Sequence, residues 1–495
     1  MNVLQGKKYW GKTGKWAKVF MAALLALNFS VAGFLAAYAD GDVVYVEPGI
    51  APDDGEQVSS QAPGSAGETA SGGQEGGMTD QNISQGTDAS QDGANHQAVS
   101  QDGSNHQAVS QESQGGGSAD QELHGVWISY LEWNKMPKTQ AEFQQAADVM
   151  LDWCVNWGMN AVFIHAHSHT DAAYPSDILP WSKFVSGVQG QNPGFDPFGY
   201  FVNAAHARGL QVHAWFNPYR VTGYLMSWDE VSENSPAKQW LTDQIAENDR
   251  WVLQHNGEYY LNPSIPQVRE LVAASVREVL VKYDVEGIHF DDYFYPTVDD
   301  QNPAAWFDLP EYVQSGSQLS AANWRRENVN QLVSLVYATV KEVKPSAVFG
   351  ISPQGYLGNV RSDTSLFIDI DQWMESAGYV DYIMPQLYWG FEAKTSDGQP
   401  ASFAFHENLA SWIGLKNKGS VKLYLGLGMY RAGTDVKDNN PVSEWLRCDD
   451  IMKRQVEAGR ASGQVSGYCF FSYSSFLEET SAREVANLVP VLRGE

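Results

Sequence analysis

Two adjacent aspartates close a short apolar run in the second half of the chain. The stretch "GIHFDDYFYP" (287–296) places Asp291 and Asp292 after β-prone residues and before three aromatics and a proline. Paired carboxyl groups can share acid, base and nucleophile roles in bond cleavage. The alternative is structural, with Asp291 salt-bridged in the core to Arg325 or Arg326 and Asp292 capping a helix or a turn.

The segment that positions these aspartates alternates β-prone runs with amphipathic helical runs. Helices are expected over 139–158, 198–208, 266–282, 321–343 and 481–492. The eight β runs are "HGVWISYL" (124–131), "AVFIHAHS" (161–168), "LQVHAWFNPYR" (210–220), "VEGIHFDDYFYP" (285–296), "AVFGISPQG" (347–355), "VDYIMPQLYW" (380–389), "VKLYLGLGMYR" (421–431) and "VSGYCFFSYSSF" (465–476). This alternation predicts an α/β fold, a (β/α)8 TIM barrel rather than an open doubly wound sheet. The sequence has no GxGxxG or GxxxxGK[ST] motif, which excludes the commonest nucleotide-binding enzymes with open sheets.

The position of the aspartates within this fold favours chemistry. In a TIM barrel the C-terminal ends of the strands open onto the active face. Alternation along the strand turns Ile288 and Phe290 toward the helices, and His289 and Asp291 toward the barrel axis. Asp292 then begins the following loop.

The other strand ends combine aromatic rings with amide, hydroxyl, imidazole and guanidinium groups. Rings stack on the C–H faces of sugars, and polar groups bind their hydroxyls. As a set they favour a sugar-binding site made of Trp127, His165, Trp215, Asn217, Arg220, Ser352, Gln386, Tyr388, Trp389, Tyr430 and Tyr473.

Six motifs resemble those of a known family. They are "VHAWFNPYR" (212–220), "YLNPSIPQVRE" (260–270), "GIHFDDYFYP" (287–296), "WRRENVNQLV" (324–333), "FGISPQG" (349–355) and "MPQLYWG" (384–390). In order and spacing they resemble the glycosyl hydrolase-like 10 family of exported bacterial proteins, over about residues 122–480. The resemblance implies a TIM-barrel glycosidase acting on peptidoglycan glycan strands freed of their stem peptides. The site positions that it implies are Asn217, Arg220, Asn262, Asp291, Asp292, Tyr293, Arg325, Arg326, Ser352, Gln386, Tyr388 and Trp389.

The second catalytic carboxyl group is left open by the sequence. Glycosidases place two carboxyl groups roughly 5–5.5 Å apart when they retain configuration and roughly 6.5–9.5 Å apart when they invert it. We assign Asp291 as nucleophile or base, and Asp292 as the acid, reached through a break in the strand, or as an orienting group. Glu392 and Glu132, each just beyond a strand end, are the alternative acids. This scheme requires no cofactor.

Two other classes of function fit the same barrel. A metal-dependent hydrolase could use His165, His167, His213, His289 and Asp291 as ligands, because imidazole and carboxylate suit zinc. A non-catalytic barrel that binds glycan without turnover is the second class.

The N-terminal quarter has the sequence features of an exported protein. Lysines at 7, 8, 12, 15 and 18 precede an apolar run that ends at Ala39, which predicts a signal peptide over 1–39 or an uncleaved membrane anchor. Residues 40–121 are rich in Gly, Ser, Gln and Asp and contain the repeat "SQDGANHQAV" (90–99) and "SQDGSNHQAV" (100–109), which predicts a disordered linker. We therefore expect a secreted or cell-envelope protein with its barrel over 122–495, tethered to membrane or cell wall.

Charge and cysteine content agree with this interpretation. The formal net charge is −27, which disfavours nucleic acid as a partner. The three cysteines, Cys154, Cys448 and Cys469, stand singly in apolar patterns, and we expect three buried free thiols.

Overall fold

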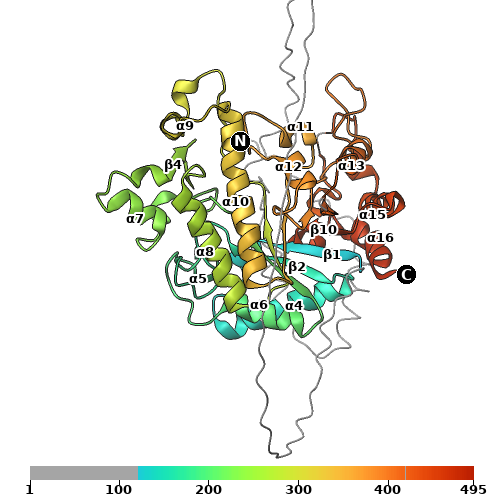
Figure 1. Ribbon diagram of the computed structural model, residues 1–495. Coiled ribbons are helices and arrows are strands. Elements are labelled where there is room, and N and C mark those ends of the chain that lie inside the picture. Colours follow the sequence, from blue (N-terminus) through green and yellow to red (C-terminus); the bar gives the residue numbers. More distant parts are fainter. Residues whose placement is uncertain (1–120, 419, 437) are drawn as a thin grey trace, which may run out of the picture. The chain divides into compact units, whose positions relative to one another are not determined.

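Eight parallel strands form a closed barrel (Figure 1). The computed structural model describes residues 121–418, 420–436 and 438–495. Each barrel strand pairs with the next one along the chain, and the last closes against the first. The predicted TIM barrel is therefore confirmed, and the eight predicted runs supply its strands: β1 (Leu123–Ile128), β2 (Ala161–His167), β3 (Gln211–Phe216), β6 (Gly287–Phe290), β7 (Val348–Ile351), β8 (Tyr382–Ile383), β9 (Lys422–Gly428) and β10 (Gly467–Phe471).

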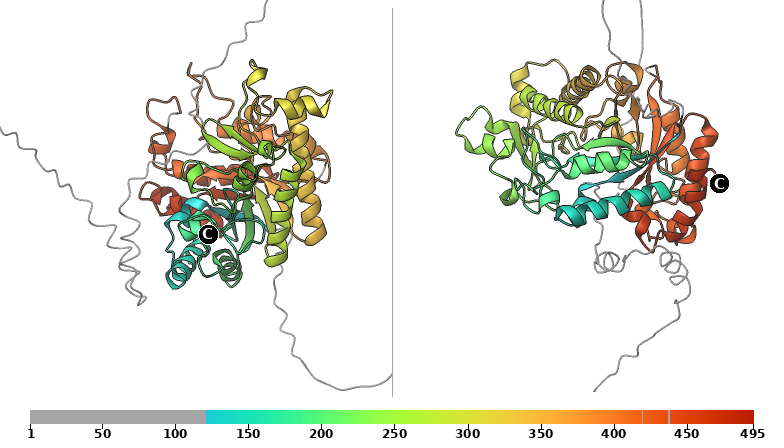
Figure 2. Two further views of the ribbon diagram at one scale, coloured as in Figure 1. Left: turned by 90° about the vertical axis from the view of Figure 1, so that its left-hand side faces the viewer. Right: turned by 90° about the horizontal axis from the view of Figure 1, so that it is seen from below.

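Helices surround the strands, as Figures 1 and 2 show from three directions. The α-helices are α3 (Tyr130–Lys135), α4 (Gln140–Asn156), α5 (Lys183–Ser186), α6 (Pro197–His206), α7 (Pro236–Thr242), α8 (Pro266–Lys282), α9 (Leu309–Ser315), α10 (Ala321–Val343), α11 (Leu357–Val360), α12 (Ile370–Glu375), α13 (Phe405–Ile413), α14 (Glu444–Arg447), α15 (Ile451–Ser462) and α16 (Ala482–Arg493). Short 3₁₀ turns are η1 (Trp228–Glu230), η2 (Asp249–Trp251), η3 (Pro303–Ala305), η4 (Met429–Arg431) and η5 (Tyr473–Leu477). The five predicted helices correspond to α4, α6, α8, α10 and α16.

A small antiparallel hairpin between β3 and α8 was not predicted. Its strands β4 (Val252–His255) and β5 (Glu258–Leu261) are joined by the two-residue turn Asn256-Gly257. The φ angles of these two residues, 51° and 85°, fit the type I′ turn that an Asn-Gly pair favours. The dipeptide was thus the available signal in the sequence.

Large rings fill the barrel interior. Trp127 of β1, Phe163 of β2, Trp215 of β3 and Tyr382 of β8 belong to one buried cluster. His289 of β6 lies among them, 5.9 Å from Trp127 and 4.9 Å from Phe163 between ring centroids. The middle of the barrel is therefore a packed aromatic core that includes a buried imidazole.

The neighbouring residue on β6 faces the other way. Phe290 packs against Phe216 of β3 and Phe349 of β7, at centroid distances of 6.0 and 5.1 Å. The predicted alternation, with His289 inside the barrel and Phe290 toward the helices, is confirmed.

Two glycines make room for the interior rings. A Cβ atom on Gly350 of β7 would lie 2.3 Å from the ring of Tyr382, and one on Gly426 of β9 would lie 2.9 Å from the Trp127 indole. Because interiors are close-packed, a methyl group at either place would force a ring to move.

The predicted signal peptide (1–39) and nearly all of the predicted linker (40–121) lie outside the described residues. Within the described ranges, none of the helices has the length and apolar character needed to cross a membrane. The three cysteines are free, as predicted. The expectation that all three are buried is wrong for Cys448, which is half-buried because it directly follows the short helix α14.

Gly350→Ala should lower the free energy of unfolding by about 1–3 kcal/mol, because the added methyl group displaces Tyr382. Urea unfolding of the variant and the parent protein measures this difference. Gly414→Ala is the matched control, since Gly414 ends α13 at a φ of −72° and its added Cβ would come no closer than 3.2 Å to another atom. Equal stability of the two variants would contradict the tight packing at Gly350.

Candidate active site

Asp291 lies at the C-terminal end of β6 and is almost fully buried, with 3% of its surface exposed. Two side chains from the end of β3 donate to its Oδ2 atom: Trp215 through Nε1 at 3.1 Å and Asn217 through Nδ2 at 3.2 Å. The structure thus brings together three residues that the sequence placed at two separate strand ends.

The surroundings of Asp291 raise the pKa of its carboxyl group toward neutral pH. Burial raises the pKa of this carboxyl group to about 6, while the Arg220 charge and the hydrogen bonds from Trp215 and Asn217 act to lower it. A carboxyl group with such a pKa can accept or hold a proton under mild conditions, which suits acid–base or nucleophilic chemistry.

Asp292 follows in a bend and is equally buried, at 3% exposure. The regular strand ends at Phe290, one residue before the pair, and the Phe294 amide donates to the Asp292 carbonyl oxygen at 2.8 Å. Strict alternation of side chains therefore no longer governs the pair.

The alternative acids have other partners. Glu132 is 1% exposed and accepts hydrogen bonds from Ser129, Ser472 and Ser474, which ties the end of β1 to the end of β10. Glu392 has a side chain that is 49% exposed and pairs with Arg447 at 2.5 Å. These contacts give Glu132 a structural role and Glu392 a place in a surface ion pair, so Asp292 is the better candidate.

The proposed structural pairing of Asp291 is wrong. Arg325 instead binds Asp308 through two hydrogen bonds, of 2.7 and 2.6 Å, and Arg326 pairs with Asp363 at 2.6 Å. Both arginines of α10 therefore form ion pairs with aspartates other than Asp291.

A buried polar chain crosses the barrel beside the site. Trp127 Nε1 donates to His289 Nε2 at 3.1 Å, and His289 Nδ1 lies 2.9 Å from the Tyr382 hydroxyl group. Because an indole can only donate, His289 Nε2 must be an acceptor and Nδ1 carries the proton. Burial holds the pKa of His289 well below its ordinary value, so the ring is neutral. Ser352 Oγ, at 3.1 Å from Nε2, joins the same chain.

Three of the histidines proposed as metal ligands, His165, His167 and His289, form hydrogen bonds within the protein. His165 accepts a hydrogen bond from the Tyr130 amide at 3.0 Å and stacks on Trp215 with centroids 3.4 Å apart. His167 faces the Asn217 carbonyl oxygen at 3.2 Å. Within the described ranges, no group of three or more His, Cys, Asp and Glu side chains is arranged to hold a metal ion. This geometry does not support the metal-dependent alternative.

Tyr388 after β8 and Tyr430 after β9, both predicted site residues, pack around Phe471 at the end of β10. Tyr388 and Tyr430 meet edge to face at 5.7 Å, and each lies about 6 Å from the Phe471 ring. Trp389 and Tyr430 are half-exposed, as is Tyr293 after β6. Partly exposed rings thus lie beyond the ends of several strands, as a sugar-binding surface requires.

Gln386 connects the strand ends. Its side chain donates to the Ser352 carbonyl oxygen at 2.9 Å, and its backbone forms isolated bridges with Gln354 and Gly426. This residue therefore fixes the segment that carries Tyr388.

Two predicted site residues have other surroundings. Asn262 is fully buried and its side chain binds the Arg250 carbonyl oxygen and both donors of Ser264, so it orders the turn between the hairpin and α8. Tyr473 packs against Trp157 at the end of α4, with centroids 5.4 Å apart. Both residues have contacts within the protein, and their assignment to the site stays a prediction.

Sequence reasoning missed Tyr130, which follows β1. Its ring lies 6.0 Å from the Arg220 guanidinium group, and the Tyr293 ring lies 4.5 Å from the same group. An aromatic residue at a strand end was the available signal.

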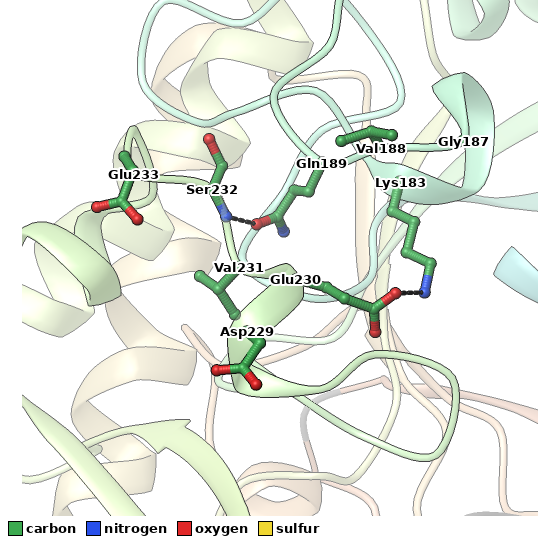
Figure 3. A pocket seen from close by; sticks show the side chains of 9 residues that line it. All are labelled: Lys183, Gly187, Val188, Gln189, Asp229, Glu230, Val231, Ser232 and Glu233. Atoms are coloured by element: carbon green, nitrogen blue, oxygen red, sulfur yellow. Dashed lines mark hydrogen bonds and ion pairs between the residues drawn. The ribbon is translucent and has the colours of Figure 1, made fainter.

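A pocket of about 500 Å³ lies elsewhere, between the segments around α5 and η1 (Figure 3). Lys183 pairs there with Glu230 at 2.5 Å, and the Ser232 amide donates to Gln189 at 2.8 Å. The nine residues that line it include none of the predicted site residues.

Asp291→Asn should gain stability relative to the parent protein as the pH rises. The carboxyl group ionises near pH 3.8 in the unfolded chain and near 6 in the folded one. Between these values the folded protein holds a proton that the unfolded chain has lost, so the parent protein loses stability as pH rises through this window. Urea unfolding at pH 4 and pH 7.5 measures the difference in the free energy of unfolding between the variant and the parent protein. Between these two pH values the difference should change by up to about 3 kcal/mol in favour of the variant.

Asp308→Asn is the control, and at pH 7.5 its effect on stability should be opposite to that of Asp291→Asn. It removes the partner of the buried Arg325 and should destabilise the protein by about 3–5 kcal/mol at pH 7.5. An Asp291→Asn difference that is independent of pH would contradict the raised pKa.

The chain is similar to glycosyl hydrolases of one known family. The model of the family glycosyl hydrolase-like 10 matches residues 122–444. Glycosyl hydrolase YngK of Bacillus subtilis (strain 168) is 34% identical over 376 residues, which span 71% of this chain and 68% of that protein. Glycosyl hydrolase DigH of Escherichia coli (strain K12) is 32% identical over 377 residues, which span 70% of this chain and 82% of that protein.

The solved structures that match part of this chain include the PgaB glycoside hydrolase domain from Bordetella bronchiseptica. It has a TM-score of 0.48 and 15% identity, and the match covers 74% of this chain and 98% of that one. The family match spans all six motifs that carried the resemblance, including the one that ends in Asp291 and Asp292. The chain therefore belongs to the glycosyl hydrolase-like 10 family.

Proposed function

We propose that this chain is an extracytoplasmic glycosidase that cleaves bacterial cell-wall glycan, namely peptidoglycan strands freed of their stem peptides. One observation carries the proposal: a buried carboxyl group with a pKa of about 6, Asp291, is held by Trp215 and Asn217 at the C-terminal end of the barrel. In TIM barrels this end is where catalytic residues gather.

Asp291 acts as the nucleophile or base in this scheme. Glycoside cleavage passes through an oxocarbenium-like transition state, which a nearby carboxylate stabilises. Trp215 and Asn217 both donate to Oδ2, so they orient the group and oppose the effect of burial on its ionisation. Asp292 is the acid or an orienting residue.

The half-exposed rings supply the sugar-binding surface. Tyr293, Trp389 and Tyr430 are accessible to a ligand, and such rings can stack on the C–H faces of successive sugars. The relatives YngK and DigH carry the name glycosyl hydrolase, which supports this assignment.

Location outside the cytoplasm rests on the sequence of the N-terminal quarter. The lysines and apolar run within 1–39 have the composition of an export signal, and the repeats within 40–121 have that of a linker. A barrel on such a tether would reach glycan in the cell envelope, and it would be membrane-anchored if the signal is not cleaved.

The substrate assignment is tested by incubating the purified full-length chain with intact peptidoglycan and with peptidoglycan stripped by an amidase. Soluble products are then analysed by mass spectrometry. We expect saccharide fragments from the stripped material and few from the intact material. Binding to both kinds of peptidoglycan without products would favour the non-catalytic class. Equal amounts of product from both kinds would contradict the proposed preference for peptide-free strands.

Asp291→Asn should lower kcat by at least about a hundredfold, because it removes the charge that stabilises the transition state. The amide keeps an oxygen for the hydrogen bonds from Trp215 and Asn217, so glycan binding and folding should be retained. Turnover, glycan binding by pull-down and the melting temperature are measured for Asp291→Asn and for Asp292→Asn and compared with those of the parent protein. A folded Asp291→Asn protein that cleaves at the parent rate would remove Asp291 from the mechanism.

A further inference from the structure

Arg220 is a buried cation without an acidic ion-pair partner among the residues that the structure describes. Three arginines of the described ranges are more than nine-tenths buried: Arg220, Arg269 and Arg325. Arg325 binds Asp308, and Arg269 donates to the Pro263 carbonyl oxygen and to Gln331. The guanidinium group of Arg220 makes no hydrogen bond or ion pair with any residue that the structure describes, although it is 7% exposed.

The backbone of Arg220 is fixed even though its head group is not paired. Its amide donates to Asn217 Oδ1 at 3.1 Å, its carbonyl oxygen accepts from Thr170 at 2.8 Å, and the residue bridges to Tyr260 of β5. Asn217 also donates to Asp291 through Nδ2. A single amide side chain therefore positions both the arginine backbone and the catalytic carboxyl group.

The head group is held by rings that leave its edge available. Its central carbon lies 4.5 Å from the Tyr293 ring and 6.0 Å from the Tyr130 ring. Contact with an aromatic face uses the π surface of a guanidinium group, so the N–H donors at its edge stay free for a ligand. The fork of these donors matches the two oxygens of a carboxylate.

Keeping a charge in this place is costly unless something compensates it. Burial acts to lower the pKa of Arg220, but the nearby Tyr130, Tyr293 and Asp291 offset this effect and the pKa is raised. Asp291 acts on Arg220 electrostatically without a salt bridge between the two side chains. An anion that enters with the substrate would complete the pairing.

We propose that Arg220 binds the carboxylate of an acidic sugar next to the scissile bond, the lactyl carboxylate of a muramic acid residue. This inference rests on the proposed function. In an intact strand that carboxyl group is tied up in the amide bond to the stem peptide, whereas removal of the peptide leaves a free carboxylate. A charge-assisted, bidentate contact forms only in the second case. Arg220 would thus make the enzyme select peptide-free strands.

The test compares two glycans and two variants of the full-length chain. The glycans are peptide-stripped strands and the same strands after chemical reduction of the lactyl carboxyl group to an alcohol. For the parent protein we expect kcat/KM to fall at least about tenfold on reduction of the glycan. For Arg220→Gln we expect a similar loss on the acidic glycan, so that its kcat/KM values on the two glycans become nearly equal.

Arg220→Lys keeps the charge without the fork and should fall between the parent and Arg220→Gln on the acidic glycan. Arg361→Gln is the control, because Arg361 is 47% exposed and pairs with Asp371 at the surface. It should leave both rates unchanged. Equal losses of Arg220→Gln on both glycans, accompanied by a shifted pH profile, would mean that Arg220 only tunes Asp291, and this would overturn the proposal.

Ligand binding separates this inference from the proposed function. Calorimetry in the absence of any glycan measures the binding of two free sugars. They are N-acetylmuramic acid and N-acetylglucosamine, which lacks the carboxylate. Preferential binding of the acidic sugar that is lost in Arg220→Gln would support the carboxylate site even if neither glycan is cleaved. Equal binding of both sugars to the parent protein would refute it.

Discussion

Removal of Asp291 from water is the constraint around which the site is organised. Burial raises the pKa of this carboxyl group to about 6, and the hydrogen bonds from Trp215 and Asn217 keep the ionised form within reach. A carboxylate in that position costs stability, as functional groups often do. The neighbouring Arg220 supplies a positive charge without forming an ion pair, so the acid is not locked in its charged form.

The barrel interior gives this site a rigid support. Trp127, His289 and Tyr382 form a hydrogen-bonded chain across the barrel from three strands, and its histidine is neutral. Gly350 and Gly426 create the space that the rings of this chain occupy. Because such packing is close, the strand ends that hold Asp291 and Asn217 are fixed relative to each other.

Much of this architecture could be predicted from the sequence, because period-two alternation and helix spacing are local patterns. The eight strands and the inward orientation of His289 followed from them. Properties that depend on tertiary partners could not be read in this way. The sequence did not indicate that Asn262 orders a turn or that Glu132 is held by three serines. Nor did it indicate that Arg220 has no acidic ion-pair partner in the described part of the chain. The β4–β5 hairpin could have been found from Asn256-Gly257.

Direct titration of Asp291 tests the central claim most sharply. The ¹³C resonance of its carboxyl group, identified by its absence from Asp291→Asn, can be followed from pH 3 to pH 9 by NMR. The electrostatics of the site predict a midpoint near 6. A midpoint at or below about 4, the ordinary value for an aspartate, would contradict a buried carboxyl group poised for acid–base chemistry.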